Sequence, residues 1–263
     1  MKKIGLVGAG AIGSMIARRL GSDFSGIARL WGIVDIDSDR ESFQRRCCKI
    51  RRRFDLESLA DACDLLIEAA GAHAAGEVAR AALSRGKDVL VMSSGGILKD
   101  IGRLRRLAIS RGGHLYVPSG AIAGLDGLTS AMAGRVSAVT LVTSKSPLSL
   151  SGVKGIMPAA IKKPTVVFEG SAAQAVKRFP KNINVSATVS MAGLWSSRTR
   201  VKIVAVPGLK ENTHELTVRG DFGTLTARSS NFPDPSNPKT SRLAALSAVA
   251  TLRKIFSPIK VGT

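Results

Sequence analysis

The sequence predicts an α/β protein: a doubly wound parallel sheet followed by an α+β domain with a mixed sheet. Three observations carry this prediction. A glycine motif, Gly8-Ala9-Gly10-Ala11-Ile12-Gly13, stands between an apolar run and an amphipathic stretch. Short apolar runs then alternate with helical patterns as far as Val117, which is typical of parallel sheets. After residue 120 strand-like runs dominate, which is typical of an α+β domain.

The first strand and helix surround the glycine motif. Ile4-Gly5-Leu6-Val7 is a short apolar run that predicts a strand. The helix after the motif is predicted by apolar residues at helical spacing: Ile12, Met15, Ile16 and Leu20. A GxGxxG motif between a strand and a helix is the dinucleotide-binding fingerprint of the Rossmann fold.

Each position of the motif has a physical role. Gly8 permits the tight turn, Gly10 lets the backbone approach a pyrophosphate, and Gly13 lets the helix pack closely on the strand. The N–H groups at the start of the helix are unpaired and hold phosphates. The predicted cofactor-binding residues of this segment are therefore Gly8, Gly10, Ala11, Ile12 and Gly13.

A second strand, residues 28–34, ends at Asp35. Asp35 follows the motif by about 20 residues, where a carboxylate takes the ribose hydroxyls in an NAD site. Arg40 follows closely and can meet the 2′-phosphate of NADP. Both NAD and NADP therefore stay open as cofactors.

The alternation continues along the first domain, predicted over residues 1–120. Further strands are predicted at 64–70, 88–93 and 114–117, and helices at 73–85 and 99–111. Ligands of such sheets bind beyond the carboxyl ends of the strands. These ends carry small residues, as a flat cofactor requires, and Ala70 is counted among the cofactor-binding residues.

The second domain, predicted over residues 121–237, has a different rhythm. Strands are predicted at 136–143, 165–169, 200–206, 214–219 and 223–228, with helices at 122–133, 171–178 and 184–194. Asn237 is a good N-cap and Pro238 suits the first helical position, so a last helix is predicted from there through Ile255. We expect the segment 238–263 to pack back on the first domain.

Composition bounds the class of protein. The chain has 263 residues, of which 44% are hydrophobic, enough for two domains with real cores and too many for intrinsic disorder. Cys47, Cys48 and Cys63 show no metal-ligand spacing, so no metal site is predicted, and this cysteine usage suits a reducing compartment. No apolar run reaches the roughly 18 residues of a membrane span, and no export signal follows Met1. We expect a cytoplasmic protein without a membrane partner.

The charge balance raises a nucleic-acid hypothesis. The 39 Lys and Arg residues against 19 acids give a net charge of +20, with the densest cluster at residues 45–53. Only 4% of residues are aromatic, which leaves few platforms for stacking bases, and no zinc-finger or RNP motif is present. The excess is spread along the chain, so no nucleic-acid partner is predicted, although a basic nucleic-acid-binding protein on a Rossmann scaffold stays as a third hypothesis.

Four segments together resemble L-aspartate dehydrogenase. They are residues 118–126 (PSGAIAGLD), residues 179–185 (FPKNINV), His214-Glu215-Leu216, and residues 237–241 (NPKTS). The resemblance covers essentially the whole chain. It implies a Rossmann domain followed by an α+β domain, and oxidation of L-aspartate by NAD or NADP to iminoaspartate or oxaloacetate with release of ammonia, linked to pyridine nucleotide biosynthesis. By analogy with such enzymes we expect a homodimer.

The resemblance also implies site residues. The catalytic histidine of the family corresponds to His214, and its cofactor-binding alanine and asparagine correspond to Ala121 and Asn184. A histidine can exchange protons near neutral pH, which hydrolysis of the imine requires. Ser94-Gly95-Gly96 and His73 depart from the family pattern, which bears on cofactor preference and rate more than on reaction class. A reductase or dehydrogenase resembling dihydrodipicolinate reductase or homoserine dehydrogenase is the alternative on the same fold.

The two carboxylates of L-aspartate need cations or N–H donors. The candidates are Lys239, Thr240 and Ser241, in the first turn of the predicted last helix, together with Ser119. An ordinary capped helix explains the first three equally well. His73, His114, Asp126 and Glu68 are interpreted as structural, and no serine or cysteine has the setting of a covalent nucleophile.

Overall fold

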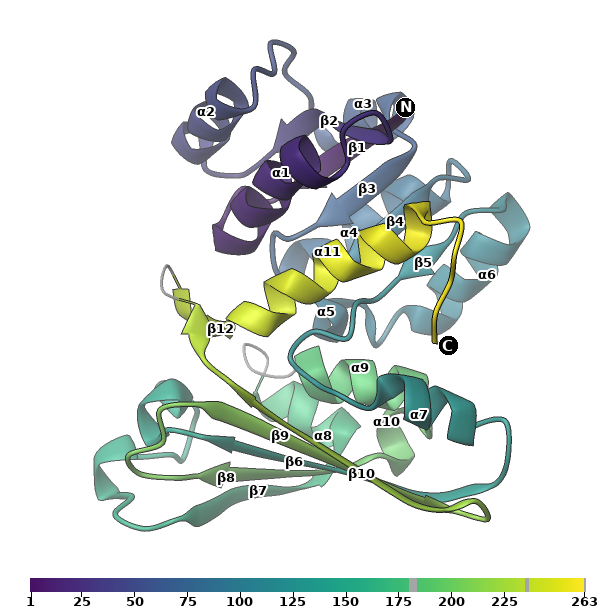
Figure 1. The fold of residues 1–263 in the computed structure, drawn as a ribbon. Helices are drawn as coiled ribbons and strands as arrows, with labels where there is room; N and C mark the ends of the chain where they lie inside the picture. Colours follow the sequence, from purple (N-terminus) through teal and green to yellow (C-terminus); the bar gives the residue numbers. More distant parts are fainter. Residues whose placement is uncertain (180–183, 235–236, 263) are drawn as a thin grey trace. The chain divides into compact units, whose positions relative to one another are not determined.

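The computed structural model describes residues 1–179, 184–234 and 237–262. The chain forms two compact units (Figure 1). Unit 1 comprises Met1–Pro118 and Ala248–Ile259, and unit 2 comprises Ser119–Ser247 and Lys260–Thr263. Each unit has its own five-stranded sheet and its own buried apolar residues.

The sheet of unit 1 is parallel, with strand order β2-β1-β3-β4-β5. Its strands are β1 (Lys2–Val7), β2 (Ala28–Val34), β3 (Leu65–Glu68), β4 (Asp88–Val91) and β5 (Leu115–Tyr116). The chain runs from β1 to β2 on one side and returns to β3 on the other side of β1. This reversal is the topological switch point, beyond which doubly wound sheets bind ligands. The predicted parallel sheet is confirmed.

The helices of unit 1 cover both faces of its sheet. They are α1 (Ala11–Asp23), α2 (Ser38–Cys47), α3 (Leu56–Ala62), α4 (Ala72–Leu83), α5 (Ser94–Ile97), α6 (Ile101–Arg111) and the second half of α11 (Arg242–Phe256). α1 and α11 lie on one face, and α3 and α4 on the other (Figure 1). Burial on both faces explains why these strands are continuous apolar runs. Within the part of the chain that the structure describes, no helix is long and apolar enough to cross a bilayer.

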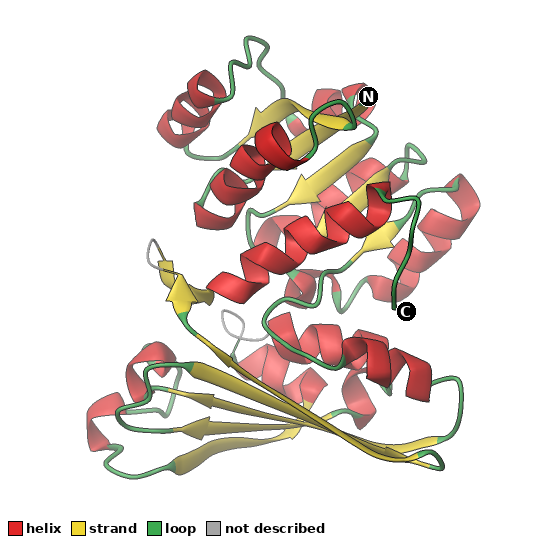
Figure 2. Cartoon of the chain, viewed as in Figure 1, coloured by secondary structure: helices red, strands yellow, loops and turns green. Residues whose placement is uncertain are grey.

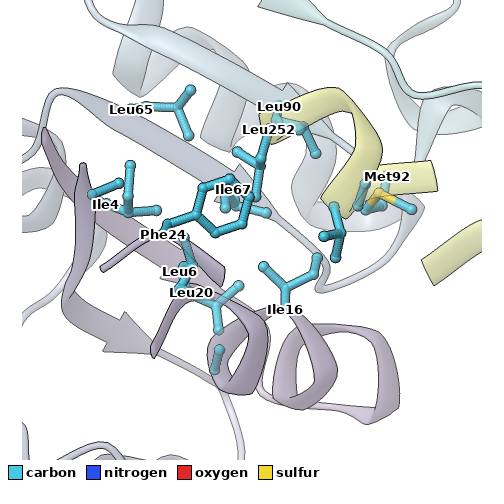
Figure 3. Packing of buried hydrophobic residues seen from close by; sticks show 14 of the residues in the cluster. Ile4, Leu6, Ile16, Leu20, Phe24, Leu65, Ile67, Leu90, Met92 and Leu252 are labelled. Carbon is cyan, nitrogen blue, oxygen red and sulfur yellow. The ribbon is translucent and has the colours of Figure 1, made fainter. Parts of the chain in front are cut away.

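One core cluster of unit 1 lies between its sheet and the helices α1 and α11 (Figure 3). Its fully or nearly fully buried members include Ile4, Leu6, Ile16, Leu20, Phe24, Ile67, Leu90 and Leu252. Phe24, at the end of α1, meets Phe256 of α11 edge to face, with ring centroids 5.8 Å apart. Arg253 also reaches Asp23, with an N–O distance of 2.6 Å. The C-terminal half of α11 is therefore part of the unit 1 core.

The start of the last helix differs from the prediction. Asn237–Ser241 is a strand, β12, which pairs antiparallel with β11 (Pro233–Asp234), and α11 begins only at Arg242. The Asn-Pro pair suits a helix start, but strand pairing prevails over this local preference. Ser241 takes the capping role, because its Oγ accepts a hydrogen bond from the Leu243 N–H at 3.2 Å.

Unit 2 has a mixed sheet, with strand order β10-β9-β6-β8-β7. Its strands are β6 (Val136–Lys145), β7 (Thr165–Ser171), β8 (Arg200–Ala205), β9 (Asn212–Gly220) and β10 (Gly223–Asn231). β6 and β8 are parallel and the other pairs antiparallel, so the predicted mixed sheet is confirmed.

The helices of unit 2 lie on one face of this sheet (Figure 2). They are α7 (Leu125–Ala131), α8 (Ala172–Arg178), α9 (Asn184–Ala192) and α10 (Trp195–Arg198), while two short 3₁₀ helices, η1 (Pro147–Leu150) and η2 (Pro158–Ala160), lie between β6 and β7 in the chain. Leu128 of α7 and Val189 of α9 pack on Leu141 and Leu216 of the sheet. Buried and partly exposed residues therefore alternate along β6 and β9, and the buried apolar ones face the helices.

Candidate active site

The backbone of the glycine turn in unit 1 leaves no room for a side chain at two of its positions. Gly8 has φ +97, and a Cβ there would lie 2.5 Å from the backbone of Ala69 and Ala70. A Cβ on Gly13 would lie 1.9 Å from the carbonyl oxygen of Gly8. These two glycines allow the turn and the close contact between α1 and the strand-end backbone.

Gly10 has a different reason to be glycine. A Cβ on Gly10 would meet no described atom of the protein within 4 Å, apart from its chain neighbours. Gly10 is the N-cap of α1 and makes no side-chain cap hydrogen bond, and Ala11 and Ile12 form the first turn, partly buried. Free N–H groups and open space at this point fit the pyrophosphate of a dinucleotide. The residues present therefore fit the cofactor that the motif implies.

Asp35 lies against the glycine turn. One carboxylate oxygen accepts a hydrogen bond from the Ala9 N–H at 2.6 Å, and the other accepts from the Asp37 N–H at 2.9 Å. The carboxylate is thus fixed beyond the carboxyl end of β2, the place of an NAD ribose ligand. Arg40 makes an ion pair with Asp37 at 3.2 Å and is half exposed.

Glu68, at the end of β3, orders the backbone on the other side of the switch point. It is 0% exposed, and one of its oxygens accepts from the N–H groups of Ala70 and Gly71, each at 2.8 Å. The hydroxyl and the N–H of Ser93 donate to the same carboxylate at 2.9 Å. Burial raises the pKa of Glu68, although each of these hydrogen bonds acts to lower it. The structural interpretation of Glu68 agrees with these contacts, which hold the predicted cofactor residue Ala70 in place.

In unit 2, the helix-facing side of the sheet changes from apolar to polar along β6 and β9. Leu141 pairs with Leu216, and at the same end of the two antiparallel strands Thr143 pairs with His214. His214 is 4% exposed, and its Nδ1 lies 3.0 Å from the Thr143 Oγ1. Thr143 therefore fixes the ring of the predicted catalytic histidine.

Lys145 stands one step further on the same face of β6 and is 8% exposed. Burial lowers the pKa of Lys145 to about 8. Burial, and second the charge of Lys145, lower the pKa of His214 to about 3, so its imidazole is neutral at neutral pH. Lys145 was not among the predicted site residues, although the alternation Leu141, Thr143, Lys145 places it on the buried side.

Ala121 lies close to His214 within unit 2. Its carbonyl oxygen accepts hydrogen bonds from Ser229 Oγ and Asn231 Nδ2, each at 2.8 Å. Ser229 is the residue of β10 that pairs with His214 of β9. Unit 2 therefore brings Ala121, predicted to bind the cofactor, and His214 to the two sides of Ser229.

The other predicted residues lie at several places in unit 2. Asn184 is the exposed first residue of α9; Asn182, named with it in the resemblance, lies outside the described residues. Ser119 is partly buried, two residues before Ala121. Lys239 and Thr240 belong to β12, so the prediction that they start a helix is wrong; their side chains are outside the description. Ser241 is buried and caps α11.

The neutral state of His214 predicts a pH dependence of stability. Between pH 6.5 and about 3 the unfolded chain binds a proton at His214 that the folded chain does not. The free energy of unfolding therefore falls as the pH drops through this window, by at most roughly 4–5 kcal/mol from this group. Urea unfolding of the wild type and of His214→Gln at pH 7 and pH 4 measures it. We expect the smaller loss in the variant; equal losses would contradict the burial of a neutral histidine.

The other two histidines, His73 and His114, are exposed rather than buried. His73 is exposed at the start of α4. His114 is mostly exposed, with its Nδ1 3.0 Å from a carboxylate oxygen of Asp88. Among the described residues, no three His, Cys, Asp or Glu side chains gather as metal ligands would.

The chain is similar to known dehydrogenases over its whole length. A family model described as aspartate dehydrogenase, C-terminal, matches residues 126–255, and one described as homoserine dehydrogenase, NAD binding domain, matches residues 8–118. The chain is 43% identical over 273 residues to the L-aspartate dehydrogenase of Methanosarcina barkeri and 40% identical over 270 residues to that of Methanocaldococcus jannaschii; both matches cover 100% of each chain.

Solved structures share the fold. The aspartate dehydrogenase of Thermotoga maritima is 24% identical, with a TM-score of 0.73 and coverage of 100% of both chains. A hyperthermophilic archaeal homoserine dehydrogenase, solved with NADPH, is 11% identical, with a TM-score of 0.63 and coverage of 96% and 97%. Sequence and fold agree: the chain belongs to the L-aspartate dehydrogenase family.

Proposed function

We propose that this protein catalyses the NAD(P)-dependent oxidative deamination of L-aspartate to iminoaspartate, which water converts to oxaloacetate and ammonia. The observation that carries the proposal is the buried, neutral His214, held by Thr143 and lying two residues from the apolar Leu216 on the helix-facing side of the sheet. The full-length relatives, named L-aspartate dehydrogenases, support the choice of substrate.

The dinucleotide is held, in this proposal, by the residues around the glycine turn and by two residues of unit 2. They are Gly8, Gly10, Ala11, Ile12, Gly13, Asp35, Ala70, Ala121 and Asn184. Bound there, the nicotinamide supplies the hydride acceptor. The chain's own part is to hold the substrate, exclude water before the oxidation, and move protons.

His214 moves the protons. When Nδ1 carries the hydrogen and donates it to Thr143 Oγ1, the lone pair of Nε2 is left to accept a proton. In this state Nε2 takes the proton of the substrate ammonium, which must be neutral before its α-carbon is oxidised. Once Nε2 has released this proton to solvent, the same nitrogen accepts a proton from the water that attacks the imine.

A substrate panel tests the reaction class. Reduced nicotinamide is followed by absorbance with L-aspartate, L-homoserine or L-malate, each with NAD and with NADP. We expect turnover with L-aspartate, with ammonia released in equal amount. Turnover with homoserine alone would overturn the proposal in favour of a homoserine dehydrogenase, the activity named for one structural neighbour and for the family model over residues 8–118.

NAD is the preferred cofactor in this proposal. The carboxylate of Asp35 suits ribose hydroxyls and repels a 2′-phosphate, while Arg40 is engaged by Asp37. Asp35→Asn keeps an acceptor for the Ala9 N–H but loses the charge. We expect the ratio of kcat/KM with NAD to that with NADP to fall about 10- to 100-fold, the effect of losing a charged hydrogen bond. An unchanged ratio would contradict the assignment of Asp35 as the ligand of the ribose hydroxyls.

Assembly, location and pathway are also proposed. The face of the unit 2 sheet away from its helices, which carries Thr140, Val142 and Thr217, supports a homodimer as in related enzymes (Figure 2). The three free cysteines support a cytoplasmic location. The product iminoaspartate supports a role in pyridine nucleotide biosynthesis. Light scattering of the purified protein tests the dimer, and a monomer mass would contradict it.

A further inference from the structure

Two adjoining hollows lie along β2, an outermost strand of the unit 1 sheet. One, of about 590 Å³, lies between β2 and the ends of α1 and α2. The other, of about 300 Å³, lies between β2 and the segment 48–54, which follows α2 in the chain. The two hollows share Arg29, Leu30, Cys48 and Lys49, and we call them together the β2-edge surface.

The β2-edge surface is separate from the cofactor site. Met1 and Ala28, which line the larger hollow, stand at the amino ends of β1 and β2. The glycine turn and Asp35 follow the carboxyl ends of the same strands, where doubly wound sheets bind their cofactors. A ligand of the β2-edge surface is therefore independent of the proposed function.

The β2-edge surface carries positive charge without compensation. Its lining contains five cations and, in the part of the chain that the structure describes, no Asp or Glu: Arg18, Arg29, Lys49, Arg51 and Arg52. The ion pairs among described residues involve none of these five. The groove between α4 and α6, of about 810 Å³, differs, because Glu57 and Glu77 also line it and Arg85 pairs with Glu57 at 2.7 Å.

The basic segment after α2 is held in a fixed conformation. The Ile50 N–H donates to the Arg45 carbonyl at 2.9 Å, and the buried Arg45 donates through Nη2 to the Arg51 carbonyl at 2.5 Å. Lys49 in this turn has φ 56, a left-handed conformation that glycine adopts at lower cost. A preformed segment loses less entropy on binding an anion than a flexible one does.

Flat groups lie among these cations. Trp31 is partly exposed, and the guanidinium carbon of Arg29 lies 4.3 Å from its ring centroid. The guanidinium carbon of Arg52 lies 4.8 Å from the ring centroid of Phe54, which is 8% exposed. Unpaired bases stack on tryptophan rings and on arginine planes, while cations bind the phosphates. A duplex keeps its bases stacked inside, so these planes favour a single strand.

We propose that the β2-edge surface binds single-stranded nucleic acid, with its cations on the phosphates and with Trp31 and the Arg52 guanidinium against the bases. This is a second activity, beside the proposed dehydrogenase reaction. The sequence predicts no such partner because its basic residues are spread along the chain, whereas the fold brings Arg18, Arg29 and residues 49–52 to one surface. Binding of this kind depends strongly on salt and little on base sequence.

The test compares two triple variants that each remove three positive charges from unit 1. The surface variant is Lys49→Gln/Arg51→Gln/Arg52→Gln. The control variant changes three exposed arginines of α6, Arg103→Gln/Arg105→Gln/Arg106→Gln. The probe is a labelled oligouridylate of about 12 nucleotides, followed by fluorescence anisotropy from about 50 mM salt upward.

The surface variant should lose affinity and salt dependence together. We expect its dissociation constant to rise about 10- to 100-fold, and the slope of log affinity against log salt to become shallower by about 2, since each phosphate contact on a single strand contributes about 0.7. The control variant should stay within about 3-fold of the wild type, with the same slope. For both variants kcat with L-aspartate should stay within about 2-fold of the wild type.

Two further variants separate binding from folding. Lys49→Gly places at φ 56 the residue that prefers it, so the thermal midpoint should not fall while the affinity for oligouridylate drops about 3- to 10-fold. Trp195→Phe leaves Trp31 as the one tryptophan of the chain, and bound oligouridylate should quench its fluorescence.

Each outcome decides the proposal. Absence of oligouridylate binding to the wild type at about 50 mM salt would overturn it, as would equal losses in the surface and control variants. Binding of a duplex of the same length, or of tripolyphosphate, as tightly as the single strand would also overturn it. Oligothymidylate in parallel shows whether RNA or DNA binds more tightly, and binding of either supports the proposal. Failure of the wild type to oxidise L-aspartate would remove the proposed function alone.

Discussion

Replacing His214 by Ala is expected to lower kcat with L-aspartate by about 10²- to 10⁴-fold, the usual contribution of a positioned acid–base group. The structure gives the reason: His214 is buried, neutral and held through Nδ1 by Thr143, so it presents one nitrogen for proton exchange. KM for L-aspartate should change much less than kcat, because the loss of an acid–base group affects the transition state more than the binding of the substrate. The measurement is steady-state kinetics with NAD at saturation.

Two controls keep this result interpretable. NADH binding, followed by fluorescence, should persist in His214→Ala, since the glycine turn lies in unit 1. His114→Ala removes a histidine whose side chain is 68% exposed and should leave kcat within about 2-fold of the wild type, as surface substitutions rarely act further. Unchanged turnover in His214→Ala would show that His214 is not the acid–base group.

The glycine turn offers the second large effect, in two variants with opposite signatures. Gly13→Ala places a methyl group 1.9 Å from the Gly8 oxygen, so the turn or the helix must move. We expect a loss of roughly 3 kcal/mol in the free energy of unfolding, and cofactor binding lost with it. Gly10→Ala places its methyl group where no described protein atom lies within 4 Å outside its chain neighbours. Its stability should stay within about 1 kcal/mol of the wild type.

Cofactor affinity separates the two variants. In Gly10→Ala the methyl group occupies the space that the backbone leaves for the pyrophosphate, and the dissociation constant of NADH should rise about 10- to 100-fold. Thermal unfolding and NADH titration of both variants give the comparison. Normal NADH affinity in Gly10→Ala would show that the cofactor does not approach the backbone at this point.

The first unit was predictable because its signals are local. The GxGxxG motif, the apolar strands and the helices after them follow short-range rules, and the parallel sheet of unit 1 follows from their alternation. α2 and α3 were missed although each has an aspartate cap, Asp37 and Asp55. α2 is almost entirely polar, so it lacks the apolar periodicity that predicts a helix.

The last helix shows the limit of local signals. Asn237 and Pro238 favour a helix start, but whether a segment joins a helix or pairs with a strand depends on which strand is available, here β11. The basic cluster shows the same limit. Arg45 appeared to be part of a charged surface, yet it is buried, donates to the Arg51 carbonyl at 2.5 Å and lies 3.9 Å from Glu41. In both cases the deciding contact lies within about eight residues along the chain, but neither capping preference nor charge pattern indicates it.

Some site residues could be predicted from the sequence, and the role of others is visible only in the structure. His214, Ala121 and Asn184 came from resemblance, because a histidine in a polar segment carries no signature of its role. Lys145 is one of many basic residues in the sequence, and only the alternation of β6 shows that it is buried on the same face as His214. Glu68 was visible as an acid within an apolar run, but two of its four hydrogen bonds come from Ser93, which follows β4.

On the proposed function, a hydride leaves the α-carbon of L-aspartate. The most direct test supplies L-aspartate carrying deuterium at that carbon, together with NAD, and measures the mass of the reduced cofactor. We expect the reduced cofactor to carry the deuterium and ammonia to appear in equal amount. Reduced cofactor without the label, or no reduction with L-aspartate while L-homoserine is oxidised, would contradict it.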